Sequence, residues 1–202
     1  MHPAEAFRVT DEAKLLNHLE RHPFVTIAAA PEGRLLVAHA PALMRRTLDS
    51  LALDFHLSRG NALAPYLAGS FAGLAVSLGA EAYVSPDWYV SVDQVPTWNY
   101  ASVEVEGRVT ALDAQDLVFL LDDLSARQET QLAPKPAWTR AKMSPGRFDK
   151  MMTMIVGARL TVDRFEGVFK LSQNKSDGDR AGVITALGDH PMAHLMRGEE
   201  GA

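Results

Sequence analysis

Cysteine is absent from this 202-residue sequence. The chain therefore has no disulfide bond, no thiolate nucleophile, no iron–sulfur cluster and no cysteine-ligated zinc site. Long apolar runs are absent too: none approaches the ~18 residues of a membrane span, and residues 1–8 lack the basic-then-apolar order of an export signal. We therefore expect a cytoplasmic protein without a membrane partner.

Positive charge is also scarce. The chain has 20 Lys and Arg residues against 25 Asp and Glu residues, which gives a net charge of -5, and its basic residues are dispersed. DNA-binding proteins draw most of their affinity from Lys and Arg side chains that neutralise phosphates. No helix-turn-helix pattern is found either. Direct binding to nucleic acid is therefore disfavoured, and a small-molecule or protein partner is expected instead.

The composition is that of an ordinary globular protein, with 47% hydrophobic and 22% charged residues. Its 11 prolines and 14 glycines are scattered, so no linker or low-complexity segment divides the chain. A chain of about 200 residues without an internal boundary usually forms one core. We expect a single domain over residues 1–202, with a helical segment at its C-terminal end.

Strand patterns dominate the chain. Apolar and polar side chains alternate in residues 51–58 and 102–110, which predicts two strands that each have a core face and a polar face. Further strands are expected at residues 24–30, 35–40, 74–84 and 158–171. Helices are expected at residues 11–21, 62–68 and 114–128, and another is expected to begin at Ser144-Pro145. Strands separated by turns, with few helices between them, predict a mainly β fold, an antiparallel β-barrel with peripheral helices.

Common catalytic signatures are missing, among them the dinucleotide-binding glycine motif, the Walker loop and the nucleophile elbow. Two histidine pairs, His18 with His22 and His190 with His194, have the i, i+4 spacing of metal ligands on a helix. Neither pair has a third ligand in the local sequence, so no metal site is predicted.

The first of the two alternating strands ends in polar residues. His56 and Ser58 share its polar face with Asp54, and Arg59 and Asn61 follow at the strand end. A phosphate dianion requires this combination of a guanidinium group, a hydroxyl group and free backbone N–H groups. The segment is a candidate phosphate site, with an ordinary polar turn as the alternative.

Two further segments carry polar groups that suit a cofactor. Trp98 and Tyr100 precede the second alternating strand and can bury a flat ring while their N–H and O–H groups stay hydrogen-bonded. A core or a subunit interface is the alternative for these aromatic residues. Lys170, Gln173 and Asn174 end the last predicted strand and offer donors to carbonyls and phosphate oxygens, with a solvated strand end as the alternative.

Taken together and in this order, the segments resemble the PaiB family, whose members are described as transcriptional regulators. The family belongs to the FMN-binding split-barrel group that includes the pyridoxamine phosphate oxidases. The resemblance covers nearly the whole chain, and its last three motifs are specific in combination. It rests on His22-Pro23-Phe24-Val25-Thr26, Val37-Ala38-His39-Ala40-Pro41, His56-Leu57-Ser58-Arg59-Gly60-Asn61, Tyr83 to Tyr89, Pro96 to Tyr100 and Lys170 to Asn174.

Three positions depart from the family pattern. Ser58 stands where alanine is usual, and Glu104 stands where the family has a histidine. The segment after Asn61 also lacks a tryptophan that is often found there. No role of the family histidine is therefore carried over to Glu104.

The resemblance implies a homodimeric split barrel that holds FMN in sites at the interface between the two chains. The motif around Arg59 is expected at the phosphate end, the motif around Trp98 along the ring, and the motif after Lys170 closing the pocket, from either chain. The cofactor-binding residues implied are His56, Ser58, Arg59, Asn61, Trp98, Asn99, Tyr100, Lys170, Gln173 and Asn174.

Three functions remain open at this point. The family suggests an FMN-binding transcriptional regulator that acts without a DNA-binding motif of its own. A flavin-dependent oxidoreductase acting on a small substrate is the alternative, because other split-barrel proteins use the bound flavin in this way. The third candidate, a haem-binding split barrel, would use His39 or His56 as the iron ligand.

Overall fold

The computed structural model describes residues 4–46 and 50–199. The chain divides into two compact units. The barrel unit comprises residues 19–77 and 104–165, and the terminal unit comprises the described residues up to 18, residues 78–103 and the described residues from 166 onward. The expectation of one domain over residues 1–202 stays a prediction.

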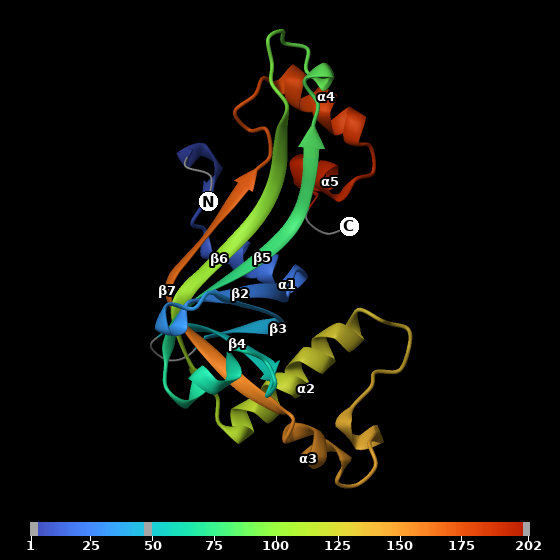
Figure 1. The fold of residues 1–202 in the computed structure, drawn as a ribbon. Coiled ribbons are helices and arrows are strands. Elements are labelled where there is room, and N and C mark those ends of the chain that lie inside the picture. The colour runs from blue at the N-terminus through green and yellow to red at the C-terminus, as the bar shows by residue number, and fades with distance from the viewer. Residues whose placement is uncertain (1–3, 47–49, 200–202) are drawn as a thin grey trace. The chain divides into compact units, whose positions relative to one another are not determined.

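Seven strands form one sheet in the order β1-β7-β4-β3-β2-β5-β6. Strand β6 also pairs with β7, so six strands close into a barrel, and β1 extends the sheet from β7 (Figure 1). The neighbouring strands β2 and β3, β3 and β4, and β4 and β7 are antiparallel. The predicted mainly β barrel is therefore confirmed. The strands are β1 Arg8–Val9, β2 Phe24–Ala29, β3 Leu36–Arg46, β4 Leu51–Ser58, β5 Phe71–Val84, β6 Thr97–Ala111 and β7 Ile155–Lys170.

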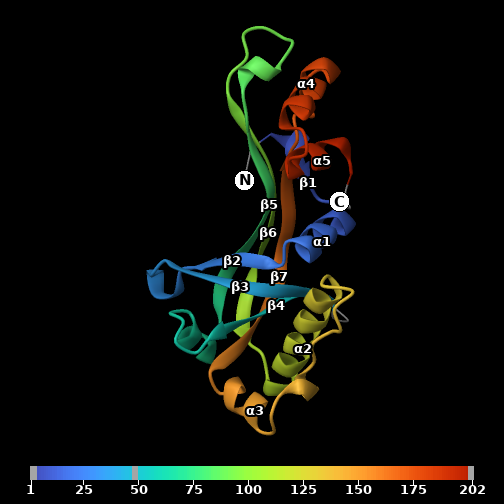
Figure 2. The ribbon, with the colours of Figure 1, turned by 90° about the vertical axis from the view of Figure 1, so that its right-hand side faces the viewer.

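Helices are few, and within the barrel unit α2 and α3 lie outside the barrel, as predicted (Figure 2). The α-helices are α1 Glu12–Arg21, α2 Ala114–Thr130, α3 Arg147–Met152, α4 Asp177–Leu187 and α5 Pro191–Arg197. Short 3-10 helices occupy Glu5–Phe7, Pro31–Gly33, Ala64–Ala68, Pro86–Trp88 and Arg140–Lys142. None of the helices found in residues 4–46 and 50–199 is both long enough and apolar enough to span a bilayer.

Strand β4 has the bounds that the sequence predicted, but its second face is not a solvent face. Asp54 is buried, with 1% of its surface exposed. Its carboxylate accepts two hydrogen bonds of 2.7 Å from Arg159, its partner in the β4–β7 register, and lies 3.8 Å from Arg45 Nε. The predicted polar face is therefore covered at Asp54, because two arginines reach over it and helix α2 contacts β3 and β4 nearby.

Strand β6 begins earlier than predicted, at Thr97 instead of Ser102. Trp98 and its neighbours therefore lie on a strand and not in a loop. Gly107 on the same strand passes close to β7, because an added Cβ would lie only 1.8 Å from the carbonyl oxygen of Thr161. This close approach gives the glycine its role in the barrel.

Two clusters of buried side chains stabilise the helices. In the barrel unit, Leu117, Leu120 and Leu124 of α2 are buried with Leu43 of β3, so the predicted helix has an apolar face that packs on the sheet. In the terminal unit, Val183 of α4 and Met192 and Met196 of α5 are buried with Val84 and Tyr89. Both views show α4 and α5 beside the connection between β5 and β6 (Figures 1 and 2), and the predicted C-terminal helical segment is thus present.

Candidate functional site

The turn that follows β4 gathers three polar side chains. Asn61 N donates to Ser58 O at 2.9 Å, and Gly60 N donates to the Ser58 hydroxyl at 3.2 Å. Asn61 Oδ1 accepts a hydrogen bond from Leu63 N at 2.9 Å, just before the 3-10 helix Ala64–Ala68. Local hydrogen bonds therefore fix the turn, and no residue in the described part of the chain accepts a hydrogen bond from the Ser58 hydroxyl or the Asn61 amide nitrogen, so both can act as donors.

Arg59 in this turn is fixed by two hydrogen bonds to the segment that precedes β7. Its backbone N donates to Met154 O at 2.9 Å, and its side-chain Nε donates to Thr153 O at 2.8 Å. The residue is exposed, and no described residue accepts a hydrogen bond from the two terminal nitrogens of its guanidinium group. Ser58, Arg59 and Asn61 thus form a donor set that fits a phosphate dianion.

His56 lies on β4 just before this turn and lines a cavity of about 350 Å³. Its Nδ1 is buried and has no hydrogen-bond partner among the described residues. Burial lowers the pKa of His56 below the usual 6.5, so the imidazole is neutral at pH 7. His56 is half-buried, whereas Ser58 and Arg59 in the turn are exposed.

A second group of predicted residues surrounds Lys170 at the end of β7, in the terminal unit. The Lys170 ammonium donates to the Thr97 hydroxyl at 2.5 Å and to Trp98 O at 2.6 Å. Burial, and to a smaller extent the charge of Lys175, lower the pKa of Lys170 from its usual value. The contact with Thr97 was not predicted, since nothing local in the sequence connects two residues so far apart.

Asn99 and Gln173 make contacts inside the terminal unit. Asn99 is fully buried, and its amide nitrogen donates to the Ser172 hydroxyl at 2.8 Å. Ser172 adopts a left-handed backbone conformation with φ of 58°. The Gln173 side chain accepts from Leu171 N and donates to Phe169 O, both at 2.6 Å. These two amides hold the bend after β7.

Trp98, Tyr100 and Asn174 are the more open members of this group. Trp98 is 53% exposed, and its ring lies edge-on to Tyr83 with 6.0 Å between ring centroids. Tyr100 is half-buried on the same strand. Asn174 is exposed and makes no hydrogen bond with any described residue. The pair of Trp98 and Tyr83 offers an exposed flat surface on which a ring can stack.

The ten predicted residues thus fall into two groups. Each unit brings the members of its own group together: the residues from His56 to Asn61 in the barrel unit and the residues around Lys170 in the terminal unit. His39, the other haem-ligand candidate, lies on β3, where its Nδ1 is 3.1 Å from the Thr26 hydroxyl. Among residues 4–46 and 50–199, no three His, Asp or Glu side chains are grouped as a metal site.

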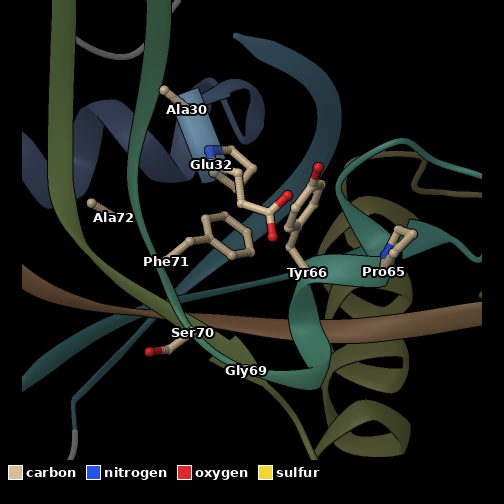
Figure 3. A pocket seen from close by; sticks show the side chains of 9 residues that line it. Ala30, Glu32, Pro65, Tyr66, Gly69, Ser70, Phe71 and Ala72 are labelled. Carbon is tan, nitrogen blue, oxygen red and sulfur yellow. The ribbon is translucent and has the colours of Figure 1, made fainter. Parts of the chain in front are cut away.

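A separate hollow of about 630 Å³ lies in the barrel unit between the β2–β3 connection and the residues that precede β5. Figure 3 shows the Glu32 carboxylate beside the rings of Tyr66 and Phe71. Glu32 has a positive φ of 52°, and no described residue pairs with its carboxylate. Sequence reasoning did not find this hollow, because no motif marks the segments that form it.

The closed six-strand barrel with one additional strand is the fold of the flavin-binding split barrels. A family model with the description "Putative FMN-binding domain" matches residues 1–164. The chain therefore belongs to this FMN-binding family, which confirms the PaiB-type resemblance of its motifs. FMN is the cofactor of the family, and the donor set in the turn fits its phosphate group.

One curated relative is similar over nearly its whole length. The chain is 27% identical over 198 residues to "Protease synthase and sporulation protein PAI 2" of Bacillus subtilis. The aligned region covers 97% of this chain and 94% of the relative.

Two solved structures share the fold. The FAD and haem binding protein of Mycobacterium smegmatis has a TM-score of 0.59 at 18% identity and covers 86% of this chain and 78% of its own. The flavocytochrome Anf3 of Azotobacter vinelandii has a TM-score of 0.57 at 14% identity, with 84% and 72% covered.

Proposed function

We propose that this chain is a PaiB-like regulatory protein that binds FMN through the turn of Ser58, Arg59 and Asn61 and acts without contacting DNA. The observation that carries the proposal is the position of Arg59, whose guanidinium is held by Thr153 O while its terminal nitrogens stay free of described partners. A regulatory role is supported by the name of the B. subtilis relative. The acidic net charge of -5 supports a small-molecule or protein partner in place of DNA.

At the phosphate end, this chain would supply three kinds of donor. Arg59 gives two parallel N–H groups, Ser58 gives a hydroxyl and Asn61 gives an amide N–H, and all three lie within one turn. Because Arg59 is already fixed by Thr153 and Met154, little side-chain freedom is lost when the phosphate binds. His56 lies on β4, the strand that leads into this turn, and its side chain lines the neighbouring cavity.

For the ring, we propose the residues of the terminal unit. Trp98 and Tyr100 would line its face, and Lys170 and Asn174 would donate hydrogen bonds to its carbonyls. Asn99 and Gln173 are proposed to act by positioning, since both are engaged in hydrogen bonds within the unit. Bound FMN supplies redox chemistry, and the protein residues hold and tune the ring.

The proposed assembly is a homodimer in the cytoplasm, in which the second group of residues comes from the partner chain. The outer face of β2 and β3 supports pairing with a second copy, because Phe24 is 67% exposed and Val37 is 59% exposed there. Such exposed apolar side chains on neighbouring strands are typical of an interaction surface. Sedimentation velocity tests the dimer, and a charge at this face, as in Val37→Glu, should shift the chain to monomers.

A flavin-dependent oxidoreductase is the second candidate function, favoured by the largely apolar cavity beside His56, which suits a small organic substrate. Steady-state reduction of bound FMN by a nicotinamide cofactor, followed by reoxidation with a candidate acceptor, distinguishes the two. Turnover supports the enzyme, and binding without turnover supports the regulator. A haem-binding protein would instead show a Soret band.

The test of the phosphate assignment is Arg59→Ala. Loss of a charge-assisted hydrogen bond pair should weaken binding of FMN by about 10-fold to 100-fold and that of riboflavin by less than about twofold. Arg108→Ala is the matched control, because Arg108 is an exposed arginine of the same unit that donates to Ser70 at 3.1 Å. If Arg59→Ala weakened the binding of FMN and of riboflavin equally, the assignment of Arg59 to the phosphate group would be wrong.

A further inference from the structure

The cavity beside His56 lies wholly within the barrel unit. It is lined by His56 of β4, by Ile155 of β7, and by residues of α2, of α3 and of the connection between these two helices. Its volume of about 350 Å³ is at the lower end of the range for small-molecule pockets. The space therefore suits a ligand of about two fused rings.

The walls are apolar and adaptable. Two aromatic side chains, Trp138 and Phe148, line the cavity together with Met143, Met151 and Met152. Flat rings stack on aromatic side chains, and methionine thioethers adjust their shape to different apolar partners. This lining selects a flat, largely apolar molecule.

His56 adds a polar group to this lining. Its imidazole makes no hydrogen bond with any described residue, and because Nδ1 has almost no accessible surface, the rest of the ring is the part that lines the cavity. A polar side chain that lines a pocket without a partner can hydrogen-bond a ligand. Arg140 and Asp122, which also line the cavity, form an ion pair of 2.8 Å and so offset each other's charge. The polar groups of the lining that carry no charge are the His56 imidazole, the Ser125 hydroxyl and the Trp138 indole N–H.

We propose that this cavity binds a small, uncharged aromatic molecule of about two fused rings that carries one hydroxyl or carbonyl group, with that group bonded to His56. The site goes beyond the proposed FMN site and does not rest on it. The Arg140 guanidinium lies over one face of Phe148, 4.7 Å from the ring centroid, so Trp138 and the other face of Phe148 hold the rings. The three methionines close around them.

The test is a titration of the full chain with 2-naphthol, followed by NMR of ¹³C-methyl methionine. The methyl signals of Met143, Met151 and Met152 should shift on binding, whereas those of Met192 and Met196 in the terminal unit should not. Shifts restricted to Met192 and Met196, or no shift up to the solubility limit of the probe, would overturn the proposal.

Matched probes and variants test the two features of the site separately. The compound 2-methylnaphthalene keeps the rings and lacks the hydroxyl, so it should bind about fivefold more weakly than 2-naphthol. In His56→Phe this preference should disappear, and a preference that persists would contradict the role of His56. Leu121→Trp, which fills the cavity from α2, should abolish binding of both probes. This variant still tests the cavity if His56→Phe does not fold.

The titration is repeated with saturating FMN to separate this site from the flavin site. Because the proposal places 2-naphthol in a distinct cavity, the three methionine shifts should appear with and without FMN. Shifts that vanish when FMN is added would assign the cavity to the flavin and overturn the proposal. If FMN itself fails to bind, the shifts in the FMN-free chain still decide the question.

Discussion

Replacing Asp54 with asparagine would measure how much the buried ion pairs of β4, the strand that leads to the phosphate turn, contribute to the free energy of unfolding. Asparagine keeps the size of the side chain and removes its charge. Two arginines would then face a neutral amide: Arg159, which now donates two hydrogen bonds of 2.7 Å, and Arg45 at 3.8 Å. An arginine cannot lose its proton, so among the described residues only the ion pairs of Arg45 with Asp123 at 2.5 Å and of Arg159 with Asp116 at 3.3 Å, together with water, would offset the two charges.

The size of the effect follows from the burial of each partner. Breaking a fully buried ion pair costs about 3–5 kcal/mol. The Asp54 side chain is only 2% exposed, but those of Arg159 and Arg45 are 28% and 29% exposed, so water compensates part of the loss. We therefore expect about 2.5 kcal/mol, which for a chain of this length lowers the Tm by roughly 8 °C.

Urea unfolding followed by far-ultraviolet circular dichroism and by tryptophan fluorescence measures this loss. The control is Glu20→Gln, because the ion pair of Glu20 with Arg127 has a similar length of 3.0 Å but lies at the surface, with side chains 61% and 47% exposed. Its loss should cost less than about 0.5 kcal/mol. If Asp54→Asn costs no more than Glu20→Gln, the argument from burial is refuted.

Two further predictions concern histidine ionisation and a close backbone approach. In an NMR titration His56 should titrate below pH 6.5, because burial lowers its pKa, and His194 should titrate above it, because hydrogen bonds to Glu199 and Asp189 raise its pKa. If His194 instead titrated at a lower pH than His56, both assignments would be disproved. The stability that neutral His56 contributes is complete above pH 6.5 and is lost as the pH falls through its folded-state pKa. Gly107→Ala should cost about 3 kcal/mol or more in urea unfolding, since its Cβ would lie 1.8 Å from Thr161 O. Gly60→Ala should cost less than about 0.5 kcal/mol, because its Cβ would meet only Ser58 Oγ at 3.7 Å, and similar costs for the two variants would contradict the steric argument.

The barrel could be predicted from the sequence where one face of a strand is apolar. The alternation in residues 51–58 gave the bounds of β4, and that in residues 102–110 located most of β6. The start of β6 was missed because Trp98, Asn99 and Tyr100 do not alternate. The environment of Asp54 was missed for a different reason: its partner Arg159 is 105 residues away in the chain.

The same distinction applies to the candidate site. The turn of Ser58, Arg59 and Asn61 is maintained by hydrogen bonds within a few residues, so local sequence was sufficient to single it out. The hydrogen bond from Arg59 to Thr153 joins residues that are 94 positions apart in the chain. The hydrogen bond from Lys170 to Thr97 joins residues that are 73 positions apart. Long-range contacts of this kind leave no periodic pattern in a single sequence.

The connection between β5 and β6 is tied to α4 through one carboxylate. Asp179 accepts hydrogen bonds from Val90 N at 2.9 Å, from Ser91 N at 2.8 Å and from the Ser91 hydroxyl at 2.8 Å. Gly182, one turn further along α4, has no room for a side chain, because a Cβ there would lie 2.1 Å from Trp88 O. Insertions and deletions in this connection are consequently confined to residues 92–96, since a change of length before Ser91 would carry the two amides out of reach of the helix.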